Sequence, residues 1–262
     1  MFSFIIYSGK RDDVMNFDGK TVLVTGSSRS LGAQIVKDFA FKGAQVIINY
    51  NKSEALAMNL KDLLERAYKK EVLCIKCDIT NENEVIAMTE KIVNKFGGID
   101  ILVNNAGVCN DSLFDEKSKE DFSKILETNV LGTYLVVKHL GKYISSGGRI
   151  INIASDNGLG YGYPESCDYD ASKAGVISLT HNMAKFYAPD VNVNCVCPGW
   201  IDTDMNVGLS SKQREEICKG ILLKRFASKE EISNLVLFLS SSLSSYINDA
   251  IITINGGVVN GR

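Results

Sequence analysis

Short apolar runs of strand character alternate with helical stretches from about residue 20 to the end of this 262-residue chain. The strand-like runs cover residues 21–25, 45–49, 71–76, 100–104, 149–154, 192–196 and 251–255. Helical spacing of apolar residues marks 31–42, 53–69, 82–96, 118–143, 169–187, 206–219 and 229–240. Strict alternation requires right-handed crossovers and a parallel sheet covered on both faces. It predicts an α/β fold, a single doubly wound (Rossmann-like) domain with about seven parallel strands, over residues 15–262.

Composition excludes several other classes of protein. Hydrophobic residues make up 45% of the chain and charged residues 23%, which is typical of a globular domain rather than a disordered one. A net charge of −2 argues against a nucleic-acid surface, which is usually basic. No apolar run reaches ~18 residues, so we expect no membrane span.

Seven cysteines are scattered along the chain, and Cys74 and Cys77 form one CxxC pair. A zinc site requires a second pair or suitably spaced histidines, and the two histidines stand alone, so we expect no metal. The scattered cysteines fit reduced thiols in a reducing cytoplasm. A redox sensor built on the CxxC pair is a weaker alternative.

Residues 1–14 precede the first predicted strand. Their apolar stretch is short for a signal peptide and no basic region precedes it. We interpret this segment as a dispensable extension, with Met15 as an alternative start.

The first loop after a strand, residues 25–32, is suited to binding a phosphate. Gly26 and Gly32 allow a tight turn before a helix, whose N-terminus attracts anions. Ser30 stands where a third glycine is usual. A plain structural turn is the alternative interpretation.

The second strand indicates which dinucleotide binds. A carboxylate at its end would hold the ribose 2′-hydroxyl of NAD, but this chain has Asn49, Tyr50 and Asn51 there. Arg29, in the phosphate turn, is suited to a 2′-phosphate. The pattern therefore favours NADPH/NADP over NADH, unless Arg29 is an ordinary surface residue.

Further polar side chains follow the third, fourth and fifth strands. Asp78 can accept a hydrogen bond from an adenine, and the small residues of 104–107 allow close approach of a ligand; both can equally cap loops. Tyr169 and Lys173 are four residues apart and share one helix face. An ammonium favours the phenolate, so we expect Lys173 to lower the pKa of Tyr169 and fit it for proton transfer, with Ser155 on the same substrate oxygen.

Together these motifs resemble the short-chain dehydrogenase/reductase family over residues 17–259. The resemblance rests on TGSSRSLG (25–32), NNAG (104–107), TNVLG around Asn129, Ser155, YDASK (169–173) and PGWIDTDM (198–205). Within the family the chain is most similar to the 3-oxoacyl-acyl-carrier-protein reductases, through PGWIDTDM, 225–241 and ITINGG (252–257).

The resemblance implies specific roles. Catalysis would fall to Ser155, Tyr169 and Lys173, with Asn129 holding a water in a proton relay. The cofactor would be bound by Gly26, Ser28, Arg29, Ser30, Leu31, Asn51, Asp78, Ile79, Asn105, Ala106, Gly107, Tyr169, Lys173, Pro198, Gly199, Ile201 and Thr203. It also implies a homotetramer packed through the helices at 118–143 and 169–187.

The expected activity is NADPH-dependent reduction of a ketone, most specifically a 3-oxoacyl thioester. A dehydrogenase for a sugar, cyclic or other secondary alcohol stays open, as does a non-catalytic dinucleotide-binding scaffold or sensor. Residues 202–226 are interpreted as a helical lid over an apolar substrate. Tyr161, Tyr163 and Trp200 form either pocket walls or lid and subunit packing. Few basic residues are available to an acyl carrier protein, since 133–148 holds only Lys138 and Lys142, so we expect that partner to bind weakly.

Overall fold

The computed structural model describes residues 15–259, which form seven strands in one parallel sheet. The strands are β1 (Thr21–Val24), β2 (Gln45–Tyr50), β3 (Leu73–Lys76), β4 (Ile99–Asn104), β5 (Ile144–Ile153), β6 (Val191–Pro198) and β7 (Ile251–Ile254). Their order across the sheet is β3-β2-β1-β4-β5-β6-β7, and every neighbouring pair is parallel. The predicted doubly wound fold is confirmed.

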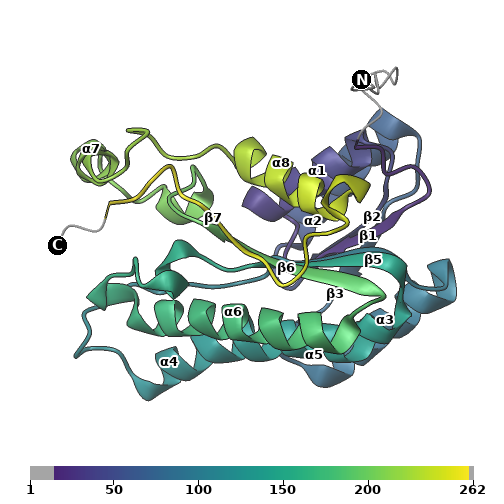
Figure 1. Ribbon diagram of the computed structural model, residues 1–262, viewed down its shortest axis with the longest axis horizontal. Helices are drawn as coiled ribbons and strands as arrows, with labels where there is room; N and C mark the ends of the chain where they lie inside the picture. The colour runs from purple at the N-terminus through teal and green to yellow at the C-terminus, as the bar shows by residue number, and fades with distance from the viewer. Residues whose placement is uncertain (1–14, 260–262) are drawn as a thin grey trace, which may run out of the picture.

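Helices cover both faces of the sheet, as Figure 1 shows. One face carries α1 (Ser30–Phe41), α2 (Glu54–Tyr68) and α8 (Lys229–Ser240). The other carries α3 (Glu82–Phe96), α4 (Lys119–Leu126), α5 (Thr133–Leu140) and α6 (Cys167–Tyr187). A core of buried apolar side chains fills each interface, with Phe39 and Val236 in the first and Leu102 and Met183 in the second.

The helix predicted over 118–143 is divided into four parts. Between α4 and α5 the chain makes a π-helix (Glu127–Gly132), and a 3₁₀ turn (Gly141–Tyr143) follows α5. A π-turn widens the helix by one residue and is common at functional sites. Its apolar spacing differs too little from that of an α-helix to be recognised in the sequence.

Strand ends also differ from the prediction. β5 begins at Ile144 rather than 149, because Ile144 pairs with Ile99 before the register shifts near Ile101. β3 begins at Leu73 rather than 71. The segment predicted as one helix over 206–219 is a 3₁₀ turn (Asp204–Asn206) followed by α7 (Ser211–Lys219).

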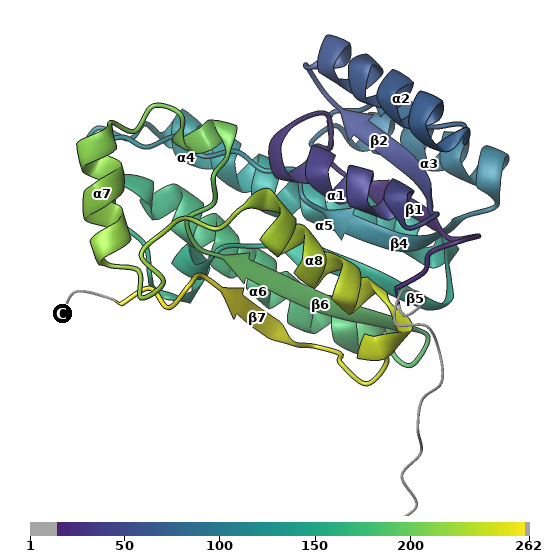
Figure 2. The same cartoon turned by 90° about the horizontal axis from the view of Figure 1, so that it is seen from above.

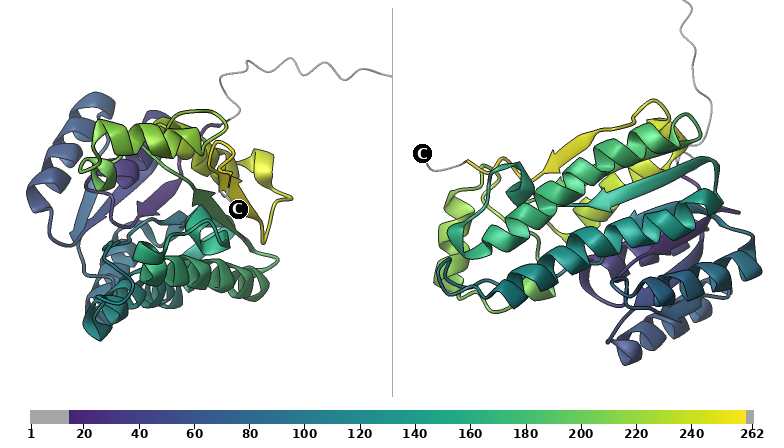
Figure 3. Two further views of the ribbon diagram at one scale, coloured as in Figure 1. Left: turned by 90° about the vertical axis from the view of Figure 1, so that its left-hand side faces the viewer. Right: turned by 90° about the horizontal axis from the view of Figure 1, so that it is seen from below.

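The strand order reverses between β1 and β4, which places a crevice at their carboxyl ends. Figure 2 shows α7 beyond this end of the sheet. Figure 3 shows α6 running beside the α4–α5 segment on one face of the sheet.

Candidate active site

The loop after β1 makes the tight turn that was predicted for a phosphate. A Cβ on Gly26 would lie 2.9 Å from the Ala106 Cα, and one on Gly32 would lie 2.5 Å from the Asn105 Nδ2. Both positions therefore require glycine. The Gly26 N–H donates to the Asn49 Oδ1 at 3.0 Å, which fixes the turn against the end of β2.

Ser30 begins α1 with a φ of +52°, in the left-handed region that favours glycine. No side chain caps the N-terminus of α1, and its first turn has no acidic residue. The helix dipole and its first N–H groups are therefore uncompensated by side chains. This arrangement fits the pyrophosphate of a dinucleotide, and the roles of Ser28, Ser30 and Leu31 in binding it stay predictions.

The ends of β2 and β3 carry the residues expected around the rest of the cofactor. The Asn51 Nδ2 donates to the Asp78 Oδ2 at 2.8 Å. Burial alone would raise the pKa of Asp78, but hydrogen bonds from Thr80 and Asn51 lower it, so its carboxylate stays a charged acceptor. Arg29 is exposed and has no carboxylate partner among residues 15–259.

The NNAG turn after β4 is held against the phosphate turn by Thr25, which was not predicted as a site residue. The Thr25 Oγ1 accepts from the N–H groups of Asn105 and Ala106, each at 3.0 Å. The Asn105 Nδ2 donates to the Thr25 carbonyl at 2.9 Å. The sequence signal that could have identified Thr25 as a site residue is its position directly before Gly26.

Ser155, Tyr169 and Lys173 come together at the carboxyl end of β5, as predicted. The Lys173 Nζ lies 5.5 Å from the centroid of the Tyr169 ring and donates to the Ile153 carbonyl at 2.8 Å. Ser155 and Lys173 are buried, and the Ser155 hydroxyl acts on the Tyr169 phenol so as to lower its pKa. The three side chains can contact one small polar group.

The pKa of Tyr169 is raised, which contradicts the expectation that Lys173 lowers it. Burial of the phenol is the main cause, followed by the nearby Cys109, and the Ser155 hydrogen bond only partly offsets them. Burial also lowers the pKa of Lys173 to about 8, because it disfavours the ammonium. Desolvation therefore has the largest effect on the pKa of both groups.

Asn129 lies in the π-helix, and protein groups fix its side chain. Its Nδ2 donates to the Val108 carbonyl and the Ser172 Oγ, each at 2.9 Å, and its Oδ1 accepts from the Val108 N–H at 2.8 Å. Gly107 passes so close that a Cβ there would lie 3.4 Å from the Lys173 Nζ. Asn129 is therefore placed beside Lys173, and its part in a proton relay stays a prediction.

The remaining predicted cofactor residues lie at the same sheet edge. Pro198 ends β6, and the Gly199 N–H donates to the Ile254 carbonyl at 3.1 Å. Ile201 pairs with Ala227, and Thr203 precedes the 3₁₀ turn. Ile79 follows Asp78 and packs against Gly132 of the π-helix.

Two acids beside Ser155 and Tyr169 were not foreseen, a buried Asp156 and a half-buried Asp170. The Asp156 Oδ1 lies 3.4 Å from the Ser155 Oγ, and its Oδ2 accepts from the Asn255 Nδ2 at 3.1 Å. The Asp170 Oδ1 accepts from the Asn157 Nδ2 at 2.7 Å. Burial raises the pKa of both carboxyl groups. Their places within S-D-N-G and Y-D-A-S-K were the available signal.

Aromatic side chains connect the loop after β5 with the loop after β6. The rings of Tyr163 and Trp200 are 6.2 Å apart, and those of Trp200 and Phe226 are 5.4 Å apart. α7 contains no buried residue, so it is only lightly packed. These contacts fit either interpretation of Tyr163 and Trp200, and the lid stays a prediction.

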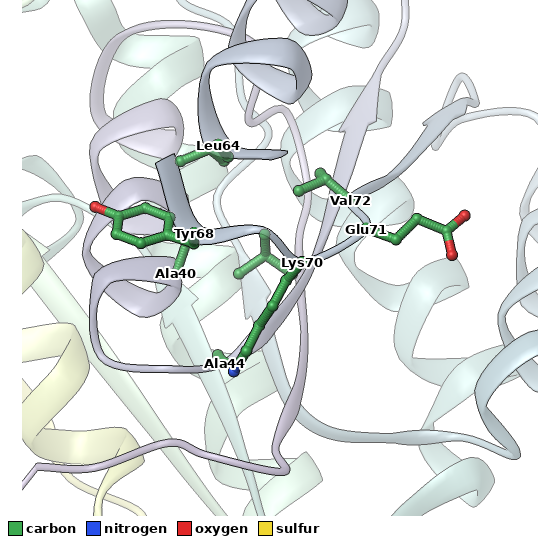
Figure 4. Close-up of a pocket in the computed structure, with 8 residues that line it drawn as sticks. Ala40, Ala44, Leu64, Tyr68, Lys70, Glu71 and Val72 are labelled. Atoms are coloured by element: carbon green, nitrogen blue, oxygen red, sulfur yellow. The ribbon is translucent and has the colours of Figure 1, made fainter. Parts of the chain in front are cut away.

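Other features do not provide a site. An apolar recess between α1, α2, β2 and the residues just before β3 (Figure 4) has a volume of about 10 Å³, the size of one water molecule. Among residues 15–259 no group of three His, Cys, Asp or Glu is arranged for a metal, and no helix is long and apolar enough to cross a membrane. Burial raises the pKa of Cys74 to about 11 and of Cys77 to about 12, which opposes thiolate chemistry at the CxxC pair.

A sequence profile described as Enoyl-(Acyl carrier protein) reductase matches residues 26–259. The chain belongs to the short-chain dehydrogenase/reductase family. It is therefore an oxidoreductase, with a fold that binds a nicotinamide dinucleotide.

Curated relatives match over nearly their full length. The 3-oxoacyl-[acyl-carrier-protein] reductase FabG of Aquifex aeolicus is 39% identical over 93% of this chain and 99% of its own. The protein of the same name from Thermotoga maritima is 37% identical over 94% and 100%.

Solved structures agree with the fold. A dehydrogenase/reductase from Sinorhizobium meliloti superposes with a TM-score of 0.89 at 30% identity, covering 94% of this chain and 97% of its own. A short-chain dehydrogenase from Burkholderia cenocepacia in complex with NADP gives 0.88 at 31% identity, covering 92% and 98%.

Proposed function

We propose that this protein reduces a 3-oxoacyl thioester to the 3-hydroxyacyl thioester with NADPH. The observation that carries the proposal is the cluster of Ser155, Tyr169 and Lys173 beside a turn fitted to a dinucleotide. The curated relatives named as 3-oxoacyl-[acyl-carrier-protein] reductases support this choice of substrate.

The protein's part in the reaction is orientation and proton transfer. When bound, NADPH supplies the hydride. The Ser155 hydroxyl hydrogen-bonds the carbonyl oxygen, and the Tyr169 phenol gives that oxygen its proton. The Tyr169 phenol is protonated at neutral pH and can donate its proton, which suits reduction, and burial raises its pKa further. Lys173 titrates near neutrality and can return a proton to Tyr169.

Replacement of Tyr169 by Phe tests this assignment. Loss of the proton donor should lower kcat for acetoacetyl thioester reduction by ~10²–10⁴-fold. NADPH binding, followed by cofactor fluorescence, should be retained. A Phe variant that keeps wild-type turnover would refute the role of Tyr169.

Arg29 supports the choice of NADPH, because its guanidinium is exposed at the phosphate turn and has no carboxylate partner within residues 15–259. A charge-assisted hydrogen bond contributes about 1.5–3 kcal/mol, so Arg29→Ala should reduce the preference for NADPH over NADH by roughly 10- to 150-fold. The ratio of kcat/KM for NADPH to that for NADH, in the wild type and in the Arg29→Ala variant, measures this preference. Equal use of both cofactors by the wild type would contradict the proposal.

A second candidate is a dehydrogenase for a sugar or another secondary alcohol. The carboxyl groups of buried Asp156 and half-buried Asp170 favour it, since carboxylates accept hydrogen bonds from polyols. The acetoacetyl thioester should be compared with cyclic ketones and sugars. Turnover of those compounds with an inert thioester would establish this second function instead.

The surface and the cysteines bear on the protein's partners and on its compartment. An acyl carrier protein would meet few free cations, since Lys138 is paired with Glu82 at 2.7 Å, which supports weak, salt-sensitive docking. Exposed Leu131, Tyr134 and Phe186 on the 118–143 and 169–187 helices support a homotetramer built on them. Seven cysteines without a disulfide support a reducing compartment such as the cytoplasm.

A further inference from the structure

Lys117 and Asp168 form an ion pair that is unlike the other ion pairs within residues 15–259. Their Nζ and Oδ1 are 2.9 Å apart, and their side chains are 3% and 0% exposed. In every other pair at least one side chain is more than a quarter exposed. The two residues are 51 positions apart, so the contact joins separate segments of the chain.

The pair joins the loop 107–118 to the first turn of α6. On the α6 side, Asp168 directly precedes Tyr169, and its Oδ1 also accepts the Tyr169 N–H at 2.8 Å. On the loop side, the Lys117 Nζ donates to the Asn110 carbonyl at 2.7 Å, which closes the loop on itself. The carboxylate therefore contacts both the loop and the backbone of the proposed proton donor.

The same loop runs along the catalytic groups. It begins at Gly107 beside Lys173, and Val108 exchanges two hydrogen bonds with the Asn129 side chain. Further along, the Ser112 N–H donates to the Glu165 carbonyl at 3.2 Å, just before α6. Residues 108–118 therefore form a wall next to Tyr169, and the ion pair holds its far end.

Both partners have to be charged for this contact to be favourable. Burial opposes the ammonium of Lys117, yet the hydrogen bond and charge of Asp168 raise its pKa overall. A buried ion pair is costly to break from one side, because the remaining charge is left without a partner. Loss of either partner should therefore weaken the contact between the loop and α6.

We propose that Lys117 and Asp168 are positioning residues for the substrate, holding the 107–118 loop against the turn of α6 that carries Tyr169. This inference rests on the proposed function, since it takes Tyr169 as the proton donor. Neither Lys117 nor Asp168 belongs to the turn between β1 and α1 that fits the dinucleotide phosphates, so we expect the pair to act on substrate placement more than on cofactor binding.

The test is a set of substitutions on both sides of the contact. Lys117→Met and Asp168→Asn should each raise KM for an acetoacetyl thioester at least ten-fold and lower kcat, with the Kd for NADPH within two-fold of wild type. Asn at 168 still accepts the Tyr169 N–H, so it removes only the charge. Lys117→Arg, which can keep the ion pair, should hold KM within three-fold of wild type.

Two further measurements separate positioning from general loss of structure. Lys119→Met removes an exposed lysine two residues away and should leave KM unchanged. In the double variant the two effects should be clearly less than multiplicative, because both remove the same contact. Amide hydrogen exchange should become faster in residues 108–118 of each single variant and stay unchanged in β1 and α1.

The outcomes distinguish this inference from the proposed function. An active wild type whose Met and Asn variants keep their KM, or lose NADPH affinity in parallel, would overturn the positioning role. A wild type that reduces no ketone would instead refute the proposed function, and the hydrogen-exchange comparison would still decide whether the pair holds the loop.

Discussion

At the scale of single residues, Asp156 links the stability of the fold to pH. It is 4% exposed, and burial raises its pKa in the folded protein. The folded state therefore binds this proton more tightly than the unfolded chain. Below the unfolded pKa of ~3.9 the group is protonated in both states and does not affect stability. Above its raised folded pKa it is charged in both states, and the buried charge destabilises the fold by the full amount.

Asp156→Asn should therefore stabilise the protein at neutral pH. The gain should be on the order of 1 kcal/mol, or about 2–4 °C in Tm, and it should disappear as the pH falls toward ~4. Thermal unfolding from pH 4 to pH 8 measures it. Exposed Asp115→Asn is the matched control and should show no such trend. A Tm difference independent of pH would contradict the burial argument.

Residues that act through local backbone geometry were largely predictable from sequence. The glycines of the phosphate turn and the i, i+4 pair of Tyr169 and Lys173 need only their neighbours in the chain to define their positions. The contact of Lys117 with Asp168 depends on how two distant segments meet, which spacing does not encode. The pKa of Tyr169 depends on burial, which spacing also does not measure.

At the scale of elements, the order and type of the strands and main helices were predicted, and their ends less well. α8 matches its predicted range, because Ser228 and Glu231 form a capping box that marks its start. The π-helix was missed because it retains a helical pattern. Its last residue makes a long-range contact that spacing does not encode, since a Cβ on Gly132 would lie 2.6 Å from the Ile79 Cδ1.

At the scale of the whole molecule, the core begins close to the start of the described residues. The Phe17 ring packs on Phe39 at 4.9 Å, and the Phe17 N–H donates to the Lys42 carbonyl at 2.9 Å. Residues 1–14, predicted to be dispensable, lie outside the described residues. Their deletion should change the free energy of unfolding by less than about 0.5 kcal/mol, as for other changes away from the core.

Urea unfolding, NADPH oxidation and light scattering of the shortened chain would test this expectation. Activity and the mass of the assembly should match those of the full chain. Insoluble protein, or a change in mass, would show that the extension contributes to the fold or to a subunit contact.

The strand order also determines how the sheet can grow during synthesis. β2 and β3 add outward from one side of β1, and β4 to β7 add outward from the other, so no strand has to enter between two strands that are already paired. α8 is made late, yet Ile232, Val236 and Leu237 pack in the core beside α1. On the ribosome, the apolar surface of α1, β5 and β6 that α8 covers therefore stays exposed until almost the whole chain has emerged, and this surface is where a nascent chain would need protection from aggregation.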